Sequence, residues 1–221
     1  MKIADRLARI WQTIPAGVTL VAVSKFHPVD ALQEAYDCGQ RVFGESRVQE
    51  LMTKQPVLPA DIEWHFIGTL QTNKVKYIAP FIHLIQSIDS LKLLAAVDRE
   101  AKKCGRRIRI LIEVHIAEEA SKHGFTPDEC RELFAGDTLN AYSHIRVVGL
   151  MGMATFTDDE TQVRREFRKL RSLFEELRSL PSAGDDFKEL SMGMSDDYPL
   201  ALEEGSTMVR VGTKIFGNRI Y

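Results

Sequence analysis

The residue with the clearest capacity for chemistry is Lys25, which directly follows the apolar run from Val18 to Ser24. An apolar, β-branched run of this length predicts a strand that is buried on both faces. Burial disfavours the charged form of an amine, and an uncharged lysine is a nucleophile for aldehydes. A lysine at a strand end can also extend its charge to water, and the run taken alone favours that structural role.

A second group of residues near the C-terminus has the types expected around a phosphate. Ser195 precedes a short helical stretch, so its hydroxyl and the first amides of that helix would point at an anion. Gly212 and Thr213 offer close backbone approach and one more hydroxyl, and Arg210 is a permanent cation within an apolar strand that needs an acceptor. Ordinary helix capping and a structural salt bridge would explain the same residues. Together with Lys25, the group suits a phosphorylated aldehyde: pyridoxal phosphate, or a sugar phosphate held as a Schiff base.

The elements that must position these residues alternate between strand-like and helix-like segments. The strand candidates are Thr19–Ser24, Arg41–Gly44, Glu63–Ile67, His83–Ser87, Arg107–His115, Ile145–Met151, Phe187–Ser191 and Met208–Val211. Eight strands, each followed by a helix, predict a (β/α)8 barrel, with a doubly wound open sheet as the alternative. In such barrels the functional residues lie at the C-terminal ends of the strands, and phosphates bind after strands seven and eight.

The helices between these strands are signalled by their ends and by their apolar spacing. Asp30–Cys38 and Ser90–Cys104 are each followed by a glycine, which is typical of a helix C-terminus. A further helix is predicted to begin at a capping box formed by Thr157 and Glu160, with an apolar face that runs to Leu180. The helix Ala4–Ile14 precedes the first strand and would close the bottom of the barrel or lie along its side.

Composition excludes several classes of protein. The 221 residues carry 29 basic and 31 acidic side chains, so we expect no general attraction to nucleic acid or membrane. The three cysteines are widely spaced and indicate a reducing cytosol, and the six histidines are scattered, so no metal site is predicted. No signal peptide and no apolar run of roughly twenty residues are present. We expect one cytoplasmic domain over residues 1–221.

Four segments carry a resemblance to a known family. They are Val21-Ala22-Val23-Ser24-Lys25, Phe43-Gly44-Glu45-Ser46-Arg47-Val48-Gln49-Glu50, Trp64-His65-Phe66-Ile67-Gly68-Thr69-Leu70-Gln71-Thr72-Asn73-Lys74 and Ser191-Met192-Gly193-Met194-Ser195. In this order they resemble the pyridoxal phosphate homeostasis protein family, which is similar to the barrel domain of alanine racemases. The resemblance extends from the N-terminal helix to Tyr221.

The resemblance implies a role for each residue of the two groups. Lys25 would hold pyridoxal 5′-phosphate covalently as a Schiff base, and Ser195, Gly212 and Thr213 would hold its phosphate. Arg210 would face the pyridine nitrogen and keep it unprotonated, because adjacent positive charges repel. The cofactor is then a weak electron sink, adequate for proton exchange and poor for decarboxylation.

Two residues depart from the family pattern. Ser46 stands where the family usually has an Asn close to the phenolic oxygen of the cofactor, and its shorter side chain favours a contact through water. His115 stands where Asn is common, close to the segment that contains Glu119 and Lys122. His115 either reaches the cleft or is a hydrogen-bonded histidine at a strand end.

Some polar residues near the tops of the second and third strands have no assigned role. Glu45, Glu50 and Lys74 line the cleft mouth or form ordinary salt bridges at its rim. His65 is either a cleft residue or packs against the rim of the barrel.

The sequence favours a binding protein over an enzyme. Alanine racemases take a second base, a Tyr, from a further domain of a partner, and this chain ends at Tyr221, right after the last predicted strand. We therefore expect a monomer that buffers, carries or delivers pyridoxal phosphate in vitamin B6 homeostasis, with apo-enzymes that use this cofactor as possible recipients. The alternatives are a weak racemase or transaminase-like enzyme and, less favoured, a Schiff-base aldolase without a cofactor.

Overall fold

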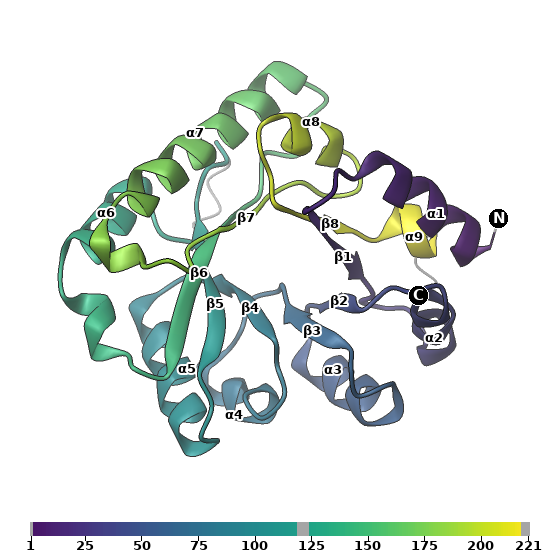
Figure 1. Cartoon of the computed structure of the whole chain (residues 1–221), viewed down its shortest axis with the longest axis horizontal. Coiled ribbons are helices and arrows are strands. Elements are labelled where there is room, and N and C mark those ends of the chain that lie inside the picture. Colours follow the sequence, from purple (N-terminus) through teal and green to yellow (C-terminus); the bar gives the residue numbers. More distant parts are fainter. Residues whose placement is uncertain (1, 119–123, 218–221) are drawn as a thin grey trace.

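Eight parallel strands close into a barrel in which each strand pairs with its neighbours in chain order, and β8 pairs with β1 (Figure 1). The structure is a computed structural model that describes residues 2–118 and 124–217. The strands are β1 Thr19–Val23, β2 Val42–Glu45, β3 Glu63–Phe66, β4 Leu84–Ile88, β5 Ile108–Val114, β6 Ile145–Gly152, β7 Glu189–Ser191 and β8 Met208–Val211. The predicted (β/α)8 barrel is confirmed, and the open sheet is wrong.

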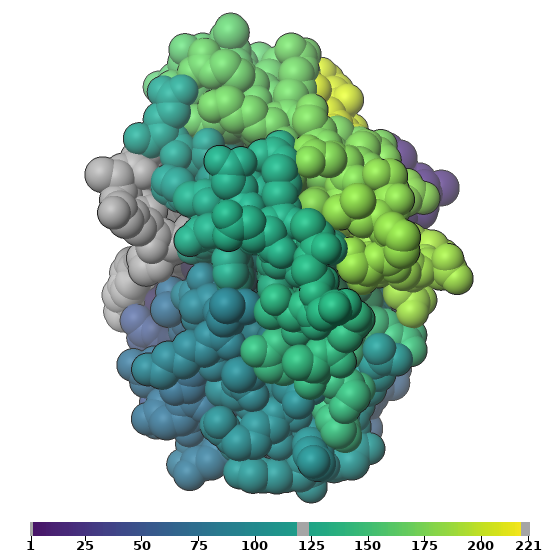
Figure 2. Space-filling model, turned by 90° about the vertical axis from the view of Figure 1, so that its left-hand side faces the viewer, coloured from purple at the N-terminus to yellow at the C-terminus, as the bar shows by residue number. Residues whose placement is uncertain are grey.

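The outer layer consists of helices that connect successive strands. The α-helices are α1 Ile3–Thr13, α2 Val29–Asp37, α3 Val48–Lys54, α4 Val75–Ile78, α5 Leu91–Lys103, α6 Pro127–Ala135, α7 Glu160–Arg178, α8 Tyr198–Glu203 and α9 Thr213–Phe216. Short 3-10 helices are η1 Gln55–Val57, η2 Thr72–Lys74, η3 Thr138–Ala141 and η4 Pro181–Ala183. The helices α5, α6 and α7 cover one flank of the barrel (Figure 2).

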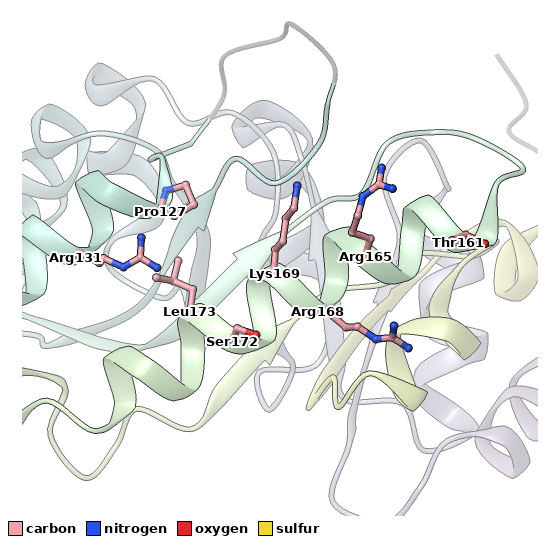
Figure 3. A pocket seen from close by; sticks show the side chains of 8 residues that line it. All are labelled: Pro127, Arg131, Thr161, Arg165, Arg168, Lys169, Ser172 and Leu173. Atoms are coloured by element: carbon pink, nitrogen blue, oxygen red, sulfur yellow. The ribbon is translucent and has the colours of Figure 1, made fainter.

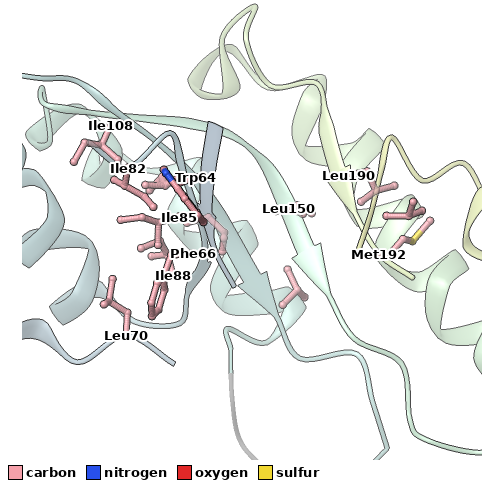
Figure 4. Close-up of a cluster of buried hydrophobic side chains, with 14 of the residues drawn as sticks. Trp64, Phe66, Leu70, Ile82, Ile85, Ile88, Ile108, Leu150, Leu190 and Met192 are labelled. Atoms are coloured by element: carbon pink, nitrogen blue, oxygen red, sulfur yellow. The ribbon is translucent and has the colours of Figure 1, made fainter. Parts of the chain in front are cut away.

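Apolar side chains form two separate packed regions. A small cluster fills the inside of the barrel: Val21, Leu84, Leu111, Val148, Met151 and Met208. A larger one lies between the strands and the helices; Figure 4 shows the part around Trp64, Phe66 and Ile85. Because alternate residues of a strand face opposite sides, strands such as β1, β5 and β8 contribute to both regions.

Several boundaries differ from the sequence predictions for local reasons. Helix α7 begins at Glu160 and is capped by Asp159, whose Oδ1 accepts from the N–H groups of Thr161 and Gln162, so the predicted cap at Thr157 is wrong. Phe187 precedes β7 and packs among aromatic rings outside the sheet, which shortens the predicted strand.

Helix α1 lies along the side of the barrel, where it packs against α2 and α9 (Figure 1). Of the two positions that the sequence left open for this helix, the side of the barrel is therefore the right one, and the bottom is not. The sequence had not assigned α3, α4, α6 and α9. Within the described part of the chain, no helix combines the length and the apolarity that crossing a bilayer would need.

Candidate functional site

The order of the strands brings the two groups of candidate residues to neighbouring strand ends. β8 lies between β7 and β1, with Ala22 opposite Val211 in the β1–β8 pair. Lys25 follows β1, Ser195 follows β7, and Gly212 follows β8 directly. All three therefore lie at the C-terminal end of the barrel, the end at which barrels of this kind carry their functional residues.

Ser195 and Gly212 are in direct contact. The backbone N–H of Gly212 donates to Ser195 Oγ over 3.1 Å, so the serine hydroxyl keeps its proton available for another acceptor. A Cβ at position 212 would lie 3.1 Å from the carbonyl oxygen of Val23, so only glycine fits this close to β1 without a shift. Thr213, which is exposed, begins α9 beside this pair. The contact differs from the prediction in one respect: α8 begins only at Tyr198, so the hydroxyl of Ser195 is directed to β8 and not to the start of that helix.

The loop that carries Ser195 is held by its own hydrogen bonds. Asp197 accepts from the N–H of Met194 over 2.5 Å, and Tyr198 N–H donates to the Met194 carbonyl over 2.8 Å. Gly193 has a φ of 92°, and its surroundings leave no room for a side chain, because a Cβ at this position would lie 2.5 Å from the Cβ of Ala201. These contacts fix the turn between β7 and α8 and hence the place of Ser195.

Arg210 is buried inside the barrel, with an exposed fraction of 4%. Its Nη1 donates to Ser191 Oγ over 2.5 Å and its Nη2 to the carbonyl of Gly152 over 3.0 Å. Burial lowers the pKa of Arg210 to about 10, against the opposing charges of Asp197 and Glu113, so the side chain is still a cation at neutral pH. Both of these acceptors are neutral oxygens, and no ion pair among the described residues includes this guanidinium.

A buried chain of polar side chains continues from Arg210 across the interior. Ser191 Oγ donates to Gln86 Oε1 over 2.7 Å, and Gln86 Nε2 lies 3.0 Å from His65 Nδ1. Burial lowers the pKa of His65 well below its usual value, and the positive charge of Arg109 acts in the same direction. His65 is therefore a neutral residue of the barrel interior, and not a residue of the cleft mouth.

Three possible metal ligands also meet near the opposite end of the barrel. One ligand atom each of Glu63, His65 and His83 lie within 4.8 Å of one another. However, Arg109 Nη1 donates a hydrogen bond to His83 Nε2 over 2.8 Å, which occupies the lone pair that a metal ion would need. The same guanidinium pairs with Glu189 over 3.2 Å. A resident cation repels a metal ion, so this cluster is a polar closure of the barrel base.

Ser46 and His115, the two residues that depart from the family pattern, directly follow strands β2 and β5. Ser46 follows β2 and is half-buried, with its backbone so close to Gly68 that a Cβ there would lie 2.5 Å from the Ser46 carbonyl oxygen. His115 is half-buried after β5, and its backbone N–H donates to the Phe125 carbonyl over 2.9 Å. The nearby Glu119 and Lys122 lie outside the described residues.

The polar residues near strands two and three separate into two environments. Glu45 is fully buried beneath α3, where it pairs with Lys54 and not with solvent at the cleft. Glu50 joins the same pair, whereas the ammonium of Lys74 lies 5.7 Å from the ring centre of Tyr77. The sequence did not single out Lys54, because the helix α3 that contains it had not been assigned.

A hollow of about 650 Å³ lies elsewhere, on the outer surface between α6 and α7 (Figure 3). Its basic lining includes Arg131, Arg165, Arg168 and Lys169. The three arginines already pair with carboxylates, among them Glu176 with Arg131. This surface is lined by residues of α6 and α7 and by none of the segments that directly follow β1, β7 and β8, so it is not part of the candidate site.

Comparison with known proteins agrees with this architecture. Residues 1–219 match the family described as "Alanine racemase, N-terminal domain". Fold and site together define a barrel of that type. A pyridoxal phosphate homeostasis protein of Aquifex aeolicus is 39% identical over 232 residues, covering 100% of both chains, and one of Schizosaccharomyces pombe is 40% identical over 92% of this chain and 85% of its own. The chain belongs to the pyridoxal phosphate homeostasis protein family, as the sequence motifs had indicated.

Solved structures give the same result. PipY of Synechococcus elongatus PCC7942 without PLP has a TM-score of 0.91 at 38% identity and covers 98% of this chain and 100% of its own. The PipY structure with PLP bound has a TM-score of 0.88 over the same shares. An alanine racemase of Clostridium difficile 630 has a TM-score of 0.78 at 14% identity over 98% of this chain and 56% of its own, which is a likeness of fold alone.

Proposed function

We propose that this protein holds pyridoxal 5′-phosphate as a Schiff base on Lys25 and acts in intracellular vitamin B6 homeostasis. The observation that carries the proposal is that Lys25 and the Ser195–Gly212 pair follow three adjacent strands at one end of the barrel, while Arg210 is buried within one of these strands, β8. The PipY structure with PLP bound, at 38% identity, supports the same ligand for this barrel.

The residues present fit the phosphate of this cofactor. The hydroxyl of Ser195 has its proton available, and the absence of a side chain at Gly212 lets its backbone lie close to both Ser195 and β1. Thr213 adds a second hydroxyl at the first position of α9. Ser46, at the end of β2, is proposed to contact the phenolic oxygen through a water molecule.

Arg210 is proposed to face the pyridine nitrogen. Its bonds to Ser191 and Gly152 use two of the five N–H groups of a guanidinium, so donors remain for a ligand atom. A cation in this place keeps the ring nitrogen unprotonated, since a second positive charge beside a buried guanidinium is unfavourable. When bound, the cofactor would thus supply only weak electron withdrawal.

Lys25 supplies the covalent link. Its amine adds to the aldehyde carbon, a C=N bond forms, and one molecule of water leaves; hydrolysis reverses the step and releases the cofactor. A reversible link of this kind suits a protein that buffers, carries or delivers the cofactor without strong turnover. The naming of the relatives as homeostasis proteins supports this role over that of an enzyme. We further propose that the chain acts as one cytoplasmic, monomeric domain, with apo-enzymes that use the cofactor as recipients.

Absorbance titration with pyridoxal phosphate tests the proposal. The purified protein is expected to develop the yellow colour of a Schiff base, and Lys25→Ala is expected to lack it while retaining the fold. A wild-type protein whose spectrum does not change on addition of the cofactor would contradict the proposal. Incorporation of solvent deuterium at the α-carbon of added amino acids, at a rate comparable with that of an enzyme, would instead favour the racemase-like alternative.

A further inference from the structure

Three charged side chains form a closed cluster on the outer side of β1 and β2, behind the candidate site. Lys54, which is 4% exposed, lies at the end of α3, and Glu45, which is fully buried, lies at the end of β2. Lys54 Nζ is 2.7 Å from Glu45 Oε1 and 2.6 Å from Glu50 Oε1. Glu45 Oε1 also accepts from the Ser24 hydroxyl over 2.6 Å. The cluster thus ties α3 to the ends of the first two strands.

The same cluster binds the backbone on both sides of Lys25. Lys54 Nζ donates its third hydrogen bond to the Ser24 carbonyl over 2.9 Å, which completes the three donors of an ammonium group. Glu50 Oε1 accepts from the backbone N–H of Phe26 over 2.6 Å. The residue before Lys25 and the residue after it are therefore held by one connected pair of side chains.

The backbone at Phe26 needs such support. Its φ of 68° makes it the one non-glycine residue with a positive φ in the described part of the chain. A bulky residue in this conformation is strained and persists only where its surroundings enforce it. Glu50 holds its N–H, and the guanidinium of Arg47 lies 4.6 Å from the centre of its ring.

We propose that Lys54 and Glu50 are positioning residues for Lys25, which fix the backbone on both sides of it so that its amine meets the aldehyde of a docked cofactor. This inference rests on the proposed function. The alternation of β1 gives the direction: Val21 faces the barrel interior and Ser24 faces Glu45 on the outside, so Lys25 is directed to the interior side. If the strained backbone at Phe26 relaxed, the backbone of Lys25 would no longer be fixed, and neither would the position of its amine.

Stability alone does not account for a cluster of this kind. Charged groups that are buried together gain little over well-packed apolar residues of the same volume, because their desolvation offsets their attraction. Here the desolvation is incompletely offset, since Glu45 Oε2 is buried without a hydrogen-bond partner among the residues that the structure describes. Burial accordingly raises the pKa of Glu45, against the lowering effect of Lys54. A positioning role gives a reason for retaining the charges.

Stopped-flow absorbance with pyridoxal phosphate and the apo-protein separates positioning from docking. The concentration dependence of the observed rate gives the constant for initial docking, which depends on the phosphate residues, and the limiting rate reports formation of the C=N bond on Lys25. We expect Lys54→Met and Glu50→Ala to lower the limiting rate at least tenfold and to leave the docking constant within twofold. Glu50→Gln retains an acceptor for Phe26 and should recover most of the rate.

Two further proteins make the comparison interpretable. Lys103→Met removes a lysine that pairs with Glu100 on the surface of α5, and it should leave both constants unchanged. The double variant Glu45→Leu/Lys54→Met replaces the buried pair by apolar groups, so it keeps the fold if Lys54→Met alone does not, and it should show the same slow limiting rate. Thermal unfolding of every variant gives its stability.

The outcomes separate this inference from the proposed function. Variants that unfold at a lower temperature but form the Schiff base at the wild-type limiting rate would overturn the positioning role and leave the proposed function intact. A wild-type protein that forms no Schiff base would overturn the proposed function, and that failure is visible without any variant.

Discussion

The buried His65 predicts a specific loss of stability in acid. Its imidazole is 2% exposed, bonded to Gln86 through Nδ1, and its pKa is lowered well below the usual value by burial. In the unfolded chain a histidine takes up a proton near pH 6.5. Below that pH the unfolded state binds a proton that the folded state does not, so the free energy of unfolding decreases as the pH falls.

The size of this loss follows from the shift. For a histidine that binds its proton only in the unfolded state, linkage lowers the free energy of unfolding by about 1.4 kcal/mol at pH 5.5, relative to neutral pH. The variant His65→Asn keeps an acceptor for Gln86 but cannot titrate. Its smaller side chain costs stability equally at both pH values, so the comparison rests on the difference between them.

Urea unfolding at pH 7.5 and pH 5.5 measures this difference. The wild type should lose about 1.4 kcal/mol more than His65→Asn between the two conditions. His144→Asn, at a half-exposed position before β6, is the control for replacing a histidine. Equal losses in the wild type and His65→Asn would refute the reasoning, because they would mean that His65 takes up its proton within the folded barrel.

Three other predictions follow from individual contacts. Gly212→Val should abolish retention of pyridoxal phosphate in gel filtration, because a side chain at this position meets the backbone next to β1. The control Gly136→Ala, where a Cβ would have no contact below 3.6 Å with the described residues, should retain the cofactor, and equal retention by the two variants would contradict the proposed phosphate site at Gly212. Burial raises the pKa of the Cys130 thiol to about 12, so iodoacetamide should label the exposed Cys104 and leave Cys130 unmodified until the protein unfolds, as peptide mass mapping can show. Asp159→Ala should lower the free energy of unfolding by about 1 kcal/mol in a urea titration, since it removes the cap of α7, and an unchanged midpoint would count against that cap.

The fold was predictable because the sequence repeats one pattern. Apolar, β-branched runs alternate with helical segments, and a parallel barrel is the architecture that eight such units form. The same regularity placed Lys25, Ser195 and Gly212 together, since all three follow strands that are neighbours in a closed barrel. Their contacts with a cofactor stay a prediction.

The residues that the sequence missed act across the barrel and not along the chain. Ser191 and Gln86 are 105 positions apart and meet only because the barrel closes. Both are polar residues within strands, which is a visible signal, but no spacing rule pairs them. Lys54 was missed for another reason: the sequence had not assigned α3, and the burial of this lysine depends on how α3 packs against β1 and β2.

Capping errors had a local cause. Thr157 and Glu160 have the spacing of a capping box, but Asp159 is also a strong capping residue and lies next to the helix. Thr157 lies before the capping residue, and its hydroxyl accepts a hydrogen bond from the N–H of Asp159 itself. Two competing caps within three residues cannot be ranked from the sequence alone.

Borohydride reduction followed by peptide mass mapping tests the central claim most directly. The protein is incubated with pyridoxal phosphate, the C=N bond is reduced to a stable amine, and the modified peptide is identified. The account predicts a single stoichiometric adduct on Lys25, lost in Lys25→Ala. An adduct on another lysine, or none at all, would contradict it.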